Sequence, residues 1–187
     1  MILIILISLF SLATLFVFSS PKFSPIPYFP SNQKDMPLII ETLELRNNQI
    51  VIDFGAGDGA VVVAGATSAF THHLNTQFIA VEINPYLLGI LQIRRFFHPN
   101  RKNIHIVRFN MFKDPIDSLI TLCSSKKEKK IVTSYFYISP RYLVPMKERL
   151  QKVLPKSTIV SYFYSISDMK AEKEKHGIHA VYRYKLI

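Results

Sequence analysis

The strongest chemical pattern in the chain is a glycine-rich turn that follows a short apolar run. Residues 51–59 read Val-Ile-Asp-Phe-Gly-Ala-Gly-Asp-Gly, which places three glycines and two carboxylates close together. Glycine at such a turn permits positive φ angles and lets a ligand approach the backbone closely. Ligands of open parallel sheets bind outside the carboxyl ends of the strands. A strand ending at Phe54 would therefore put the turn, with Asp53 beside it, at a binding site.

Two classes of ligand are compatible with a turn of this kind. Gly55, Gly57 and Ala60 satisfy the G-x-G-x-x-G/A spacing of dinucleotide sites. However, Asp53 and Asp58 would set negative charge against a pyrophosphate. The same carboxylates suit a ligand that carries an amino group and a sulfonium, as adenosylmethionine does. We therefore favour a sulfonium nucleoside over a dinucleotide.

Two further polar side chains follow the next expected strands. Glu82 ends the strand predicted at residues 77–82, and a carboxylate there can bind both hydroxyls of a ribose. Asn110 follows the strand predicted at residues 103–109, where its amide oxygen could accept from an adenine amino group. Because these positions and Asp53 lie at neighbouring strand ends, they form one coherent candidate site.

The elements that would position these side chains alternate between strand and helix, which implies an α/β fold with a mostly parallel sheet and helices on its faces. The predicted strands are 49–54, 77–82, 103–109, 130–137, 157–163 and 180–187. The predicted helices are 36–45, 60–70, 85–97, 117–123 and 140–154. No clear helix separates the last two strands, so we expect an antiparallel C-terminal edge, with residues 169–177 as a charged connection.

An apolar segment precedes this α/β domain. Residues 1–20 carry no charged side chain, and a helix of about 20 residues spans roughly 30 Å, the thickness of a hydrocarbon core. We predict a single transmembrane anchor; the alternative is a cleaved signal peptide, but no basic residue precedes the run. Residues 21–35 are rich in proline and predict an extended linker. Residues 36–187 then form the domain.

Composition restricts the partners. The net charge is +10, which favours anionic lipid, nucleic acid or an acidic protein unless it is a solvated basic face. Positive charges follow the apolar segment, which places the domain on the cytoplasmic or equivalent side of a membrane. The single cysteine, Cys123, excludes an intramolecular disulfide, and we expect a buried rather than a reactive thiol. The histidines show no ligand spacing, so no metal is expected.

The motifs carry a family resemblance. Asp53-Phe54-Gly55-Ala56-Gly57 with Glu82 resembles the signature of class I adenosylmethionine-dependent methyltransferases, which implies their Rossmann-like fold. Pro27-Tyr28-Phe29-Pro30-Ser31 and Glu82-Ile83-Asn84-Pro85-Tyr86-Leu87 resemble, more narrowly, a group of membrane-anchored lysine methyltransferases that modify the ATP synthase c-ring protein and the adenine nucleotide translocator. Asn110 and Ala60 depart from that group, which commonly has an acidic and a basic residue at these positions.

The resemblance implies adenosylmethionine as the cofactor, with Tyr28 to Ser31 folding over it. The residues expected to contact the cofactor are Tyr28, Asp53, Gly55, Ala56, Gly57, Glu82, Ile83, Asn110 and Met111. Tyr135, Phe136 and Tyr137 end the fourth predicted strand, and aromatic faces there could steady a cationic amine. Tyr135 and Tyr137 are therefore the candidate catalytic residues, with packing of the sheet as the alternative for any one ring of the three.

The expected function is membrane-anchored, adenosylmethionine-dependent methylation of a lysine in a membrane or membrane-proximal protein. In-line methyl transfer depends mainly on alignment, and a dry pocket beside positive charge would help the acceptor lysine to lose its proton. Two alternatives remain open: methylation of a lipid, quinone or other small molecule, and a non-catalytic membrane module that binds adenosylmethionine or nucleic acid. No base-stacking motif supports nucleic acid as a partner.

Overall fold

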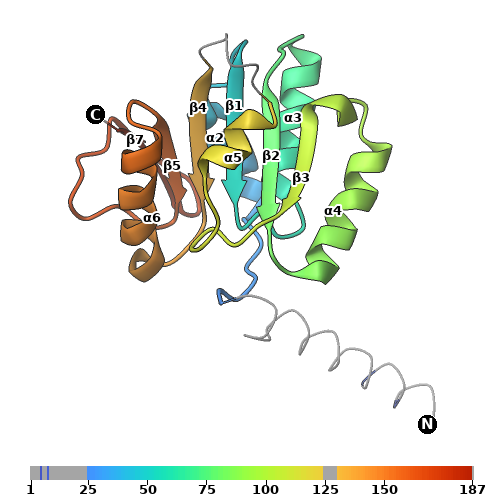
Figure 1. Ribbon diagram of the computed structural model, residues 1–187, viewed down its shortest axis with the longest axis horizontal. Coiled ribbons are helices and arrows are strands. Elements are labelled where there is room, and N and C mark those ends of the chain that lie inside the picture. The colour runs from blue at the N-terminus through green and yellow to red at the C-terminus, as the bar shows by residue number, and fades with distance from the viewer. Residues whose placement is uncertain (1–4, 6–7, 9–24, 124–129, 187) are drawn as a thin grey trace.

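The computed structural model describes residues 5, 8, 25–123 and 130–186 of the 187-residue chain (Figure 1). In chain order, its elements are η1 (Gln33–Asp35), α2 (Met36–Leu43), β1 (Gln49–Phe54), α3 (Ala60–Thr71), β2 (Gln77–Glu82), α4 (Pro85–Phe97), η2 (Arg101–Asn103), β3 (Ile104–Arg108), α5 (Asp117–Thr121), β4 (Ile131–Phe136), α6 (Pro140–Val153), β5 (Thr158–Tyr162), β6 (Lys173–His176) and β7 (Ala180–Lys185).

The strands form one sheet in the order β3-β2-β1-β4-β5-β7-β6. β1 to β5 pair in parallel, and β7 pairs antiparallel with both β5 and β6. The chain therefore builds outward from β1 to β3, then crosses to β4 on the other side of β1. Such a reversal of strand order is where open α/β sheets bind ligands, outside the carboxyl ends of the strands.

The central strands form because their residues are apolar and buried on both faces. Every residue of β1 is buried, as expected for a strand with helices on either side. One core packs α2 and α3 against the sheet through residues such as Ile39, Leu43, Val62, Ala66 and Phe78. The second packs α5 and α6 on the face turned toward the viewer in Figure 1, through residues such as Phe54, Ile79, Leu119, Leu143 and Met146.

The antiparallel C-terminal edge is confirmed, but the connection predicted at residues 169–177 is wrong in one respect. Residues Lys173 to His176 form β6, which pairs with β7 and makes the outer edge of the sheet. The sequence of this strand, Lys-Glu-Lys-His, has no alternation of apolar and polar residues, so the pattern does not predict a strand there. Charged edge strands are common because the charges discourage pairing with another chain.

Asp35 ties the start of α2 to this C-terminal hairpin. Its buried carboxylate accepts hydrogen bonds from the Tyr162 hydroxyl (2.7 Å) and from the backbone amides of Ile178 (2.7 Å) and His179 (2.9 Å). Burial alone would raise the pKa of Asp35, but these three bonds outweigh it and hold the pKa below its ordinary value. The bonds fix Tyr162 and the β6–β7 turn relative to residues that precede β1.

The predicted membrane anchor at residues 1–20 lies outside the described residues, apart from Ile5 and Ser8. Within the part of the chain that the structure describes, we find no helix with the length and apolar character needed to cross a bilayer.

Candidate functional site

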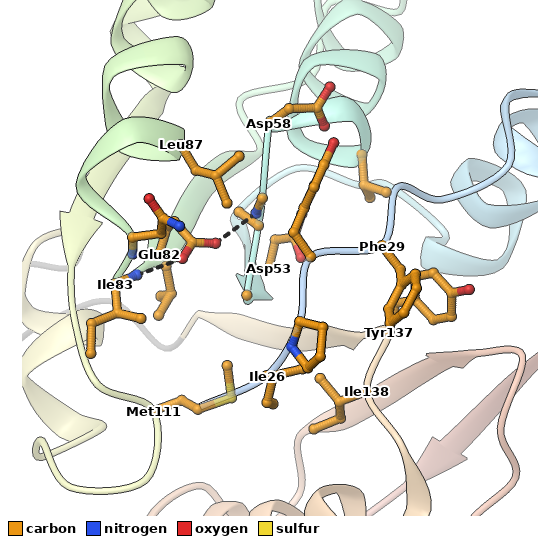
Figure 2. Close-up of a pocket in the computed structure, with 18 of the residues that line it drawn as sticks. Ile26, Phe29, Asp53, Asp58, Glu82, Ile83, Leu87, Met111, Tyr137 and Ile138 are labelled. Carbon is orange, nitrogen blue, oxygen red and sulfur yellow. Dashed lines mark hydrogen bonds between the residues drawn. The ribbon is translucent and has the colours of Figure 1, made fainter. Parts of the chain in front are cut away.

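A pocket opens at the carboxyl ends of the central strands, between the glycine-rich turn (residues 55–59) and the proline-rich segment (residues 25–31) (Figure 2). It collects residues from loops that are far apart in the sequence. Its walls include the residues Ile26, Tyr28, Phe29, Ser31, Asp53, Gly55, Ala56, Gly57, Asp58, Glu82, Ile83, Leu87, Phe109, Asn110, Met111, Phe112, Tyr135, Tyr137 and Ile138. All nine residues expected to contact the cofactor, and both candidate catalytic tyrosines, are among them.

The glycine-rich turn is anchored to β2. The amides of Gly55 and Ala56 both donate to the carbonyl oxygen of Val81, each at 2.9 Å. The φ angles of Gly55, Gly57 and Gly59 are 81°, 60° and 82°. Residues that carry a Cβ atom rarely adopt this left-handed region. A Cβ on Gly57 would also lie only 2.5 Å from the Tyr28 ring. The positive φ and this close contact together explain why glycine occupies position 57.

Glu82 joins the two loops that flank β2. Its Oε2 accepts from the Gly57 amide at 2.9 Å, and its Oε1 accepts from the amides of Ile83 (2.8 Å) and Asn84 (2.9 Å). Figure 2 draws the bonds to Gly57 and Ile83 as dashed lines. A carboxylate offers about four lone-pair positions, so these three bonds leave capacity at Oε2 for a ligand hydroxyl. The buried side chain therefore shapes the site and can still bind.

The loop after Glu82 is held by the beginning of α4. The Asn84 side chain accepts from the Tyr86 amide at 3.0 Å and caps the helix. Pro85 follows in the first turn, where its missing N–H costs nothing because the first amides of a helix have no partner within it. The local sequence Asn-Pro therefore fixes where α4 starts and how Glu82 and Ile83 face the pocket.

Asp53 lies at the end of β1 with only 3% of its surface exposed. Burial, followed by the negative charges of Glu82 and Asp58, raises the pKa of Asp53 to about 8. A proton is therefore bound to this carboxyl over much of the neutral range. A cation placed in the pocket would favour the ionised form, so the site is electrostatically prepared for a positively charged ligand.

Tyr28 covers the Gly57 side of the pocket. Burial first, and then the charge and hydrogen bond of Asp58, raise the pKa of Tyr28 to about 12. Asp58 in turn pairs with Arg94 of α4 at 2.7 Å. The proline-rich segment is thus connected to the turn after β1 on one side of the pocket, while the folding of Tyr28 to Ser31 over a cofactor stays a prediction.

The opposite end of the pocket is apolar. Ile83, Met111 and Ile138 come from separate loops and Leu87 from α4, and all four line the pocket (Figure 2). Asn110 also lines this end, but its Oδ1 accepts from the Phe112 amide at 3.0 Å. The second lone pair of this oxygen is what remains for an adenine amino group. The apolar walls suit a flat heterocycle, and the Asn110 interaction with its own loop was not anticipated from the sequence.

The three aromatic residues at the end of β4 divide between the two faces of the sheet. Tyr135 is buried, and its hydroxyl shares a hydrogen bond of 3.0 Å with Ser31 of the proline-rich segment. Tyr137 lines the pocket and packs edge-on against Tyr162, with 4.9 Å between ring centroids. Phe136 points to the opposite face and stacks on Phe54 at 5.0 Å. Phe136 is therefore part of the core, which is the packing alternative considered for each of the three rings.

Several pocket residues were not predicted from the sequence. Ile26, Phe109, Phe112 and Ile138 are single apolar side chains without a characteristic spacing. Phe29 and Leu87 lie within the two family motifs at residues 27–31 and 82–87, but only Phe29 was in a segment expected to cover the cofactor. They meet at the site because the fold brings the segment before β1 over the ends of β1 and β4.

Groups that could have supported other chemistry lie elsewhere. Across residues 25–123 and 130–186, no three histidine, cysteine or acidic side chains converge to hold a metal ion. The buried His98 is a structural residue, because its Nε2 lies 3.0 Å from the Thr67 hydroxyl and its Nδ1 accepts from the Asn100 amide. Cys123 is partly buried, and burial raises the pKa of its thiol to about 11.

Comparison with characterised sequences gives partial matches. No family model matches the chain. The Xenopus laevis lysine N-methyltransferase of the ATP synthase C-subunit is 30% identical over 100 residues, covering 54% of this chain and 39% of that protein. The Homo sapiens protein of the same name is 28% identical over 100 residues, with 54% and 38% coverage. The chain therefore spans less than half the length of the curated relatives it matches.

Comparison with solved structures gives matches over most of the chain. An RNA methyltransferase from Salinibacter ruber in complex with S-adenosyl-L-homocysteine superposes with a TM-score of 0.66 at 17% identity, covering 84% of this chain and 94% of that one. The rRNA methyltransferase aviRa from Streptomyces viridochromogenes gives a TM-score of 0.58 at 13% identity, with 90% and 89% coverage. The chain therefore has the Rossmann-like fold of the class I methyltransferases, and the resemblance of its motifs to lysine N-methyltransferases is confirmed.

Proposed function

We propose that this chain is an adenosylmethionine-dependent methyltransferase that modifies a lysine of a membrane or membrane-proximal protein. The observation that carries the proposal is the convergence of Asp53, Glu82 and the glycine-rich turn on one pocket at the topological switch point. The likeness to lysine N-methyltransferases over 100 residues supports the choice of acceptor.

The residues of the pocket fit adenosylmethionine. The buried Asp53, whose pKa is raised to about 8, would hold a cationic amino group, and the positive charge of that group would favour the ionised form of the carboxyl. Glu82 keeps acceptor capacity at Oε2 for one ribose hydroxyl, and the apolar end near Ile83 and Met111 suits adenine. The glycine-rich turn allows close approach of the ligand to the backbone.

Bound adenosylmethionine would supply a methyl group on an electrophilic sulfonium. The contribution of the protein is to align the acceptor nitrogen with that group and to keep water away, which accounts for much of the rate in such displacements. Tyr28 and its neighbours in the proline-rich segment cover the pocket. Burial is the main reason that the pKa of Tyr135 lies well above its ordinary value. Its hydroxyl therefore stays protonated at neutral pH and acts as a hydrogen-bonding group toward Ser31 rather than as a base.

A membrane location is part of the proposal and is supported by the uncharged apolar sequence of residues 1–20. An anchor would hold the pocket near membrane-embedded substrates and raise their effective concentration. The basic residues that follow the segment favour the cytoplasmic or equivalent side.

The proposal can be tested with the full chain in detergent, adenosylmethionine labelled in its methyl group, and membranes from a strain that lacks the chain. We expect a labelled protein band, with the label in methylated lysine after acid hydrolysis. At about pH 9 and with adenosylmethionine well below its dissociation constant, Asp53→Asn should weaken the band by about tenfold, while the exposed Glu148→Gln should keep it. Label in extracted lipid would show that the acceptor is a lipid instead, and no label with a correctly folded protein would refute the proposed activity.

A further inference from the structure

A cluster of aromatic rings continues outward from the pocket beside Tyr137. We define the aromatic cluster as Tyr137, Tyr162, Phe163, Tyr164 and His179. The Phe163 ring centroid lies 4.5 Å from those of both Tyr164 and His179, and 6.4 Å from that of Tyr137. The contacts are edge-on or tilted, and they connect Phe163 to Tyr137, which belongs to the pocket lining.

Phe163 adopts an unusual conformation within this cluster. Its φ angle is 72°, in the left-handed region that a bulky residue rarely occupies. Its side chain is 40% exposed, although burial would stabilise it. The backbone is held there because the Phe163 amide donates to the Ala180 carbonyl at 2.8 Å. Such strain persists where the surrounding structure imposes it, and it concentrates at functional sites.

The aromatic cluster is fixed by hydrogen bonds to the buried Asp35. Tyr162 is buried and its hydroxyl donates a hydrogen bond to Asp35, which also accepts one from the His179 amide. Tyr137 packs edge-on against this fixed Tyr162 ring. The backbone of His179 is therefore fixed by its bond to Asp35, and Tyr137 is positioned by packing against the hydrogen-bonded Tyr162 ring, which prepares the rings to receive a ligand without further ordering.

The pocket and the cluster meet at Tyr137. Tyr137 lines the same pocket as Asp53 and Glu82, and so does Phe29, which is 67% exposed. Figure 2 shows Phe29 and Tyr137 on the side of the pocket away from Glu82, one from the proline-rich segment and one from the end of β4. The wall opposite the carboxylate that would bind ribose is therefore made of aromatic rings.

We propose that Phe29, Tyr137 and Phe163 form the acceptor site, where their ring faces hold the side-chain ammonium of a lysine or of a methylated lysine. Aromatic faces attract alkylammonium groups because the ring quadrupole is negative above the plane. The same rings keep the nitrogen away from water, as transfer to a neutral amine requires. This inference rests on the proposed function and adds to it the residues that select an amine.

The experiment compares two small probes on the full chain saturated with S-adenosylhomocysteine. One probe is the amide of Nα-acetyl-Nε-trimethyllysine, and the other is its neutral isostere with a tert-butyl group in place of the trimethylammonium. We expect the charged probe to bind about fivefold more tightly than the neutral one, as cation–π attraction would produce. Titration calorimetry measures both affinities in each variant.

The ratio of the two affinities identifies the rings that produce it. Phe163→Leu and Tyr137→Leu should bring the ratio close to one, and Tyr137→Phe, which keeps the ring face, should retain it. The matched control is Phe97→Leu, because Phe97 is 79% exposed on α4, outside the pocket lining. A ratio of one in the unaltered chain, or an unchanged ratio in both leucine variants, would overturn the inference.

Failure of this inference can be told apart from failure of the proposed function. Adenosylmethionine binding is measured on the same preparations, and Phe163→Leu, whose position lies outside the pocket lining, should bind it as the unaltered chain does. If the cofactor binds normally and the two probes bind equally well, only the inference of an aromatic acceptor site is refuted. If the unaltered chain does not bind adenosylmethionine, the proposed function itself is refuted.

Discussion

The carboxylate of Glu82 accepts a hydrogen bond from the amide of Gly57 at 2.9 Å, which makes the end of β2 and the turn after β1 a single unit. Because Glu82 also accepts from the amides of Ile83 and Asn84, it organises both loops that would surround a nucleoside. One side chain therefore links the stability of the site to its capacity to bind.

Glu82→Gln should weaken both stability and cofactor binding. The side-chain nitrogen of glutamine cannot accept from an amide, and an unsatisfied buried donor costs about 1–3 kcal/mol. Loss of the bond that a ribose hydroxyl would donate to this charged acceptor should weaken adenosylmethionine binding by about tenfold. Thermal melts and calorimetry measure the two effects, with the exposed Glu148→Gln as control. A variant with unaltered affinity would show that Glu82 is purely structural.

Asp53→Asn should have opposite effects on stability and on binding. The folded-state pKa of Asp53, about 8, lies above its ordinary value. The native state therefore binds a proton that the unfolded state releases, and the contribution of Asp53 to stability falls as pH rises from about 4 to about 8. An asparagine amide carries no charge and so avoids the free-energy cost of burying an ionised carboxylate. At about pH 9 the melting temperature of Asp53→Asn should therefore exceed that of the unaltered chain by several degrees, since about 1 kcal/mol corresponds to roughly 2–4 °C at this size.

The same substitution should remove a pH dependence of cofactor affinity. In the unaltered chain, adenosylmethionine should bind more tightly as pH rises from about 6 to about 9, because ionised Asp53 attracts its cationic groups. In Asp53→Asn the affinity should be lower by about tenfold at high pH, and this increase with pH should be lost. Titration of the ligand itself is common to both proteins and cancels in the comparison. Parallel pH profiles would exclude Asp53 as the group responsible.

Gly57→Ala should displace the proline-rich segment from the turn. The added methyl group would lie 2.5 Å from the Tyr28 ring and would also strain a backbone with φ of 60°. We expect a loss of about 1–3 kcal/mol in stability. Tyr28→Ala removes the clash but not the strain, so Gly57→Ala should cost less in that background. Equal costs in both backgrounds, measured by urea unfolding, would show that Tyr28 does not press on Gly57 in solution.

Tyr135→Phe tests whether this tyrosine positions the segment or takes part in the reaction. If its hydroxyl only holds Ser31, then Tyr135→Phe and Ser31→Ala should each raise KM modestly, and the double variant should resemble either single one. The expected loss is about 1 kcal/mol, typical of one hydrogen bond. A fall in kcat of about a hundredfold in Tyr135→Phe alone would assign the hydroxyl a direct role in methyl transfer.

Much of the fold could be predicted from local sequence. The strands at 49–54 and 77–82 coincide with apolar runs because central parallel strands are buried on both faces. The start of α4 follows from Asn84 and Pro85, since an asparagine cap and a proline in the first turn act within a few residues. Strand β6 could not be found this way, because its charged residues make no buried face.

In the candidate site too, some features could be predicted from local sequence and others appear only in the folded chain. Glycine at positions of positive φ and carboxylates at strand ends are local requirements, so a short stretch of sequence suffices to predict that Asp53, Gly57 and Glu82 line the pocket. The meeting of Ser31 with Tyr135 and of Asp35 with Tyr162 is visible in the folded chain alone, because these partners are 104 and 127 residues apart. The raised pKa of Asp53 likewise depends on burial and on charges from other loops. Contacts of this kind come from packing, which no short pattern of residues encodes.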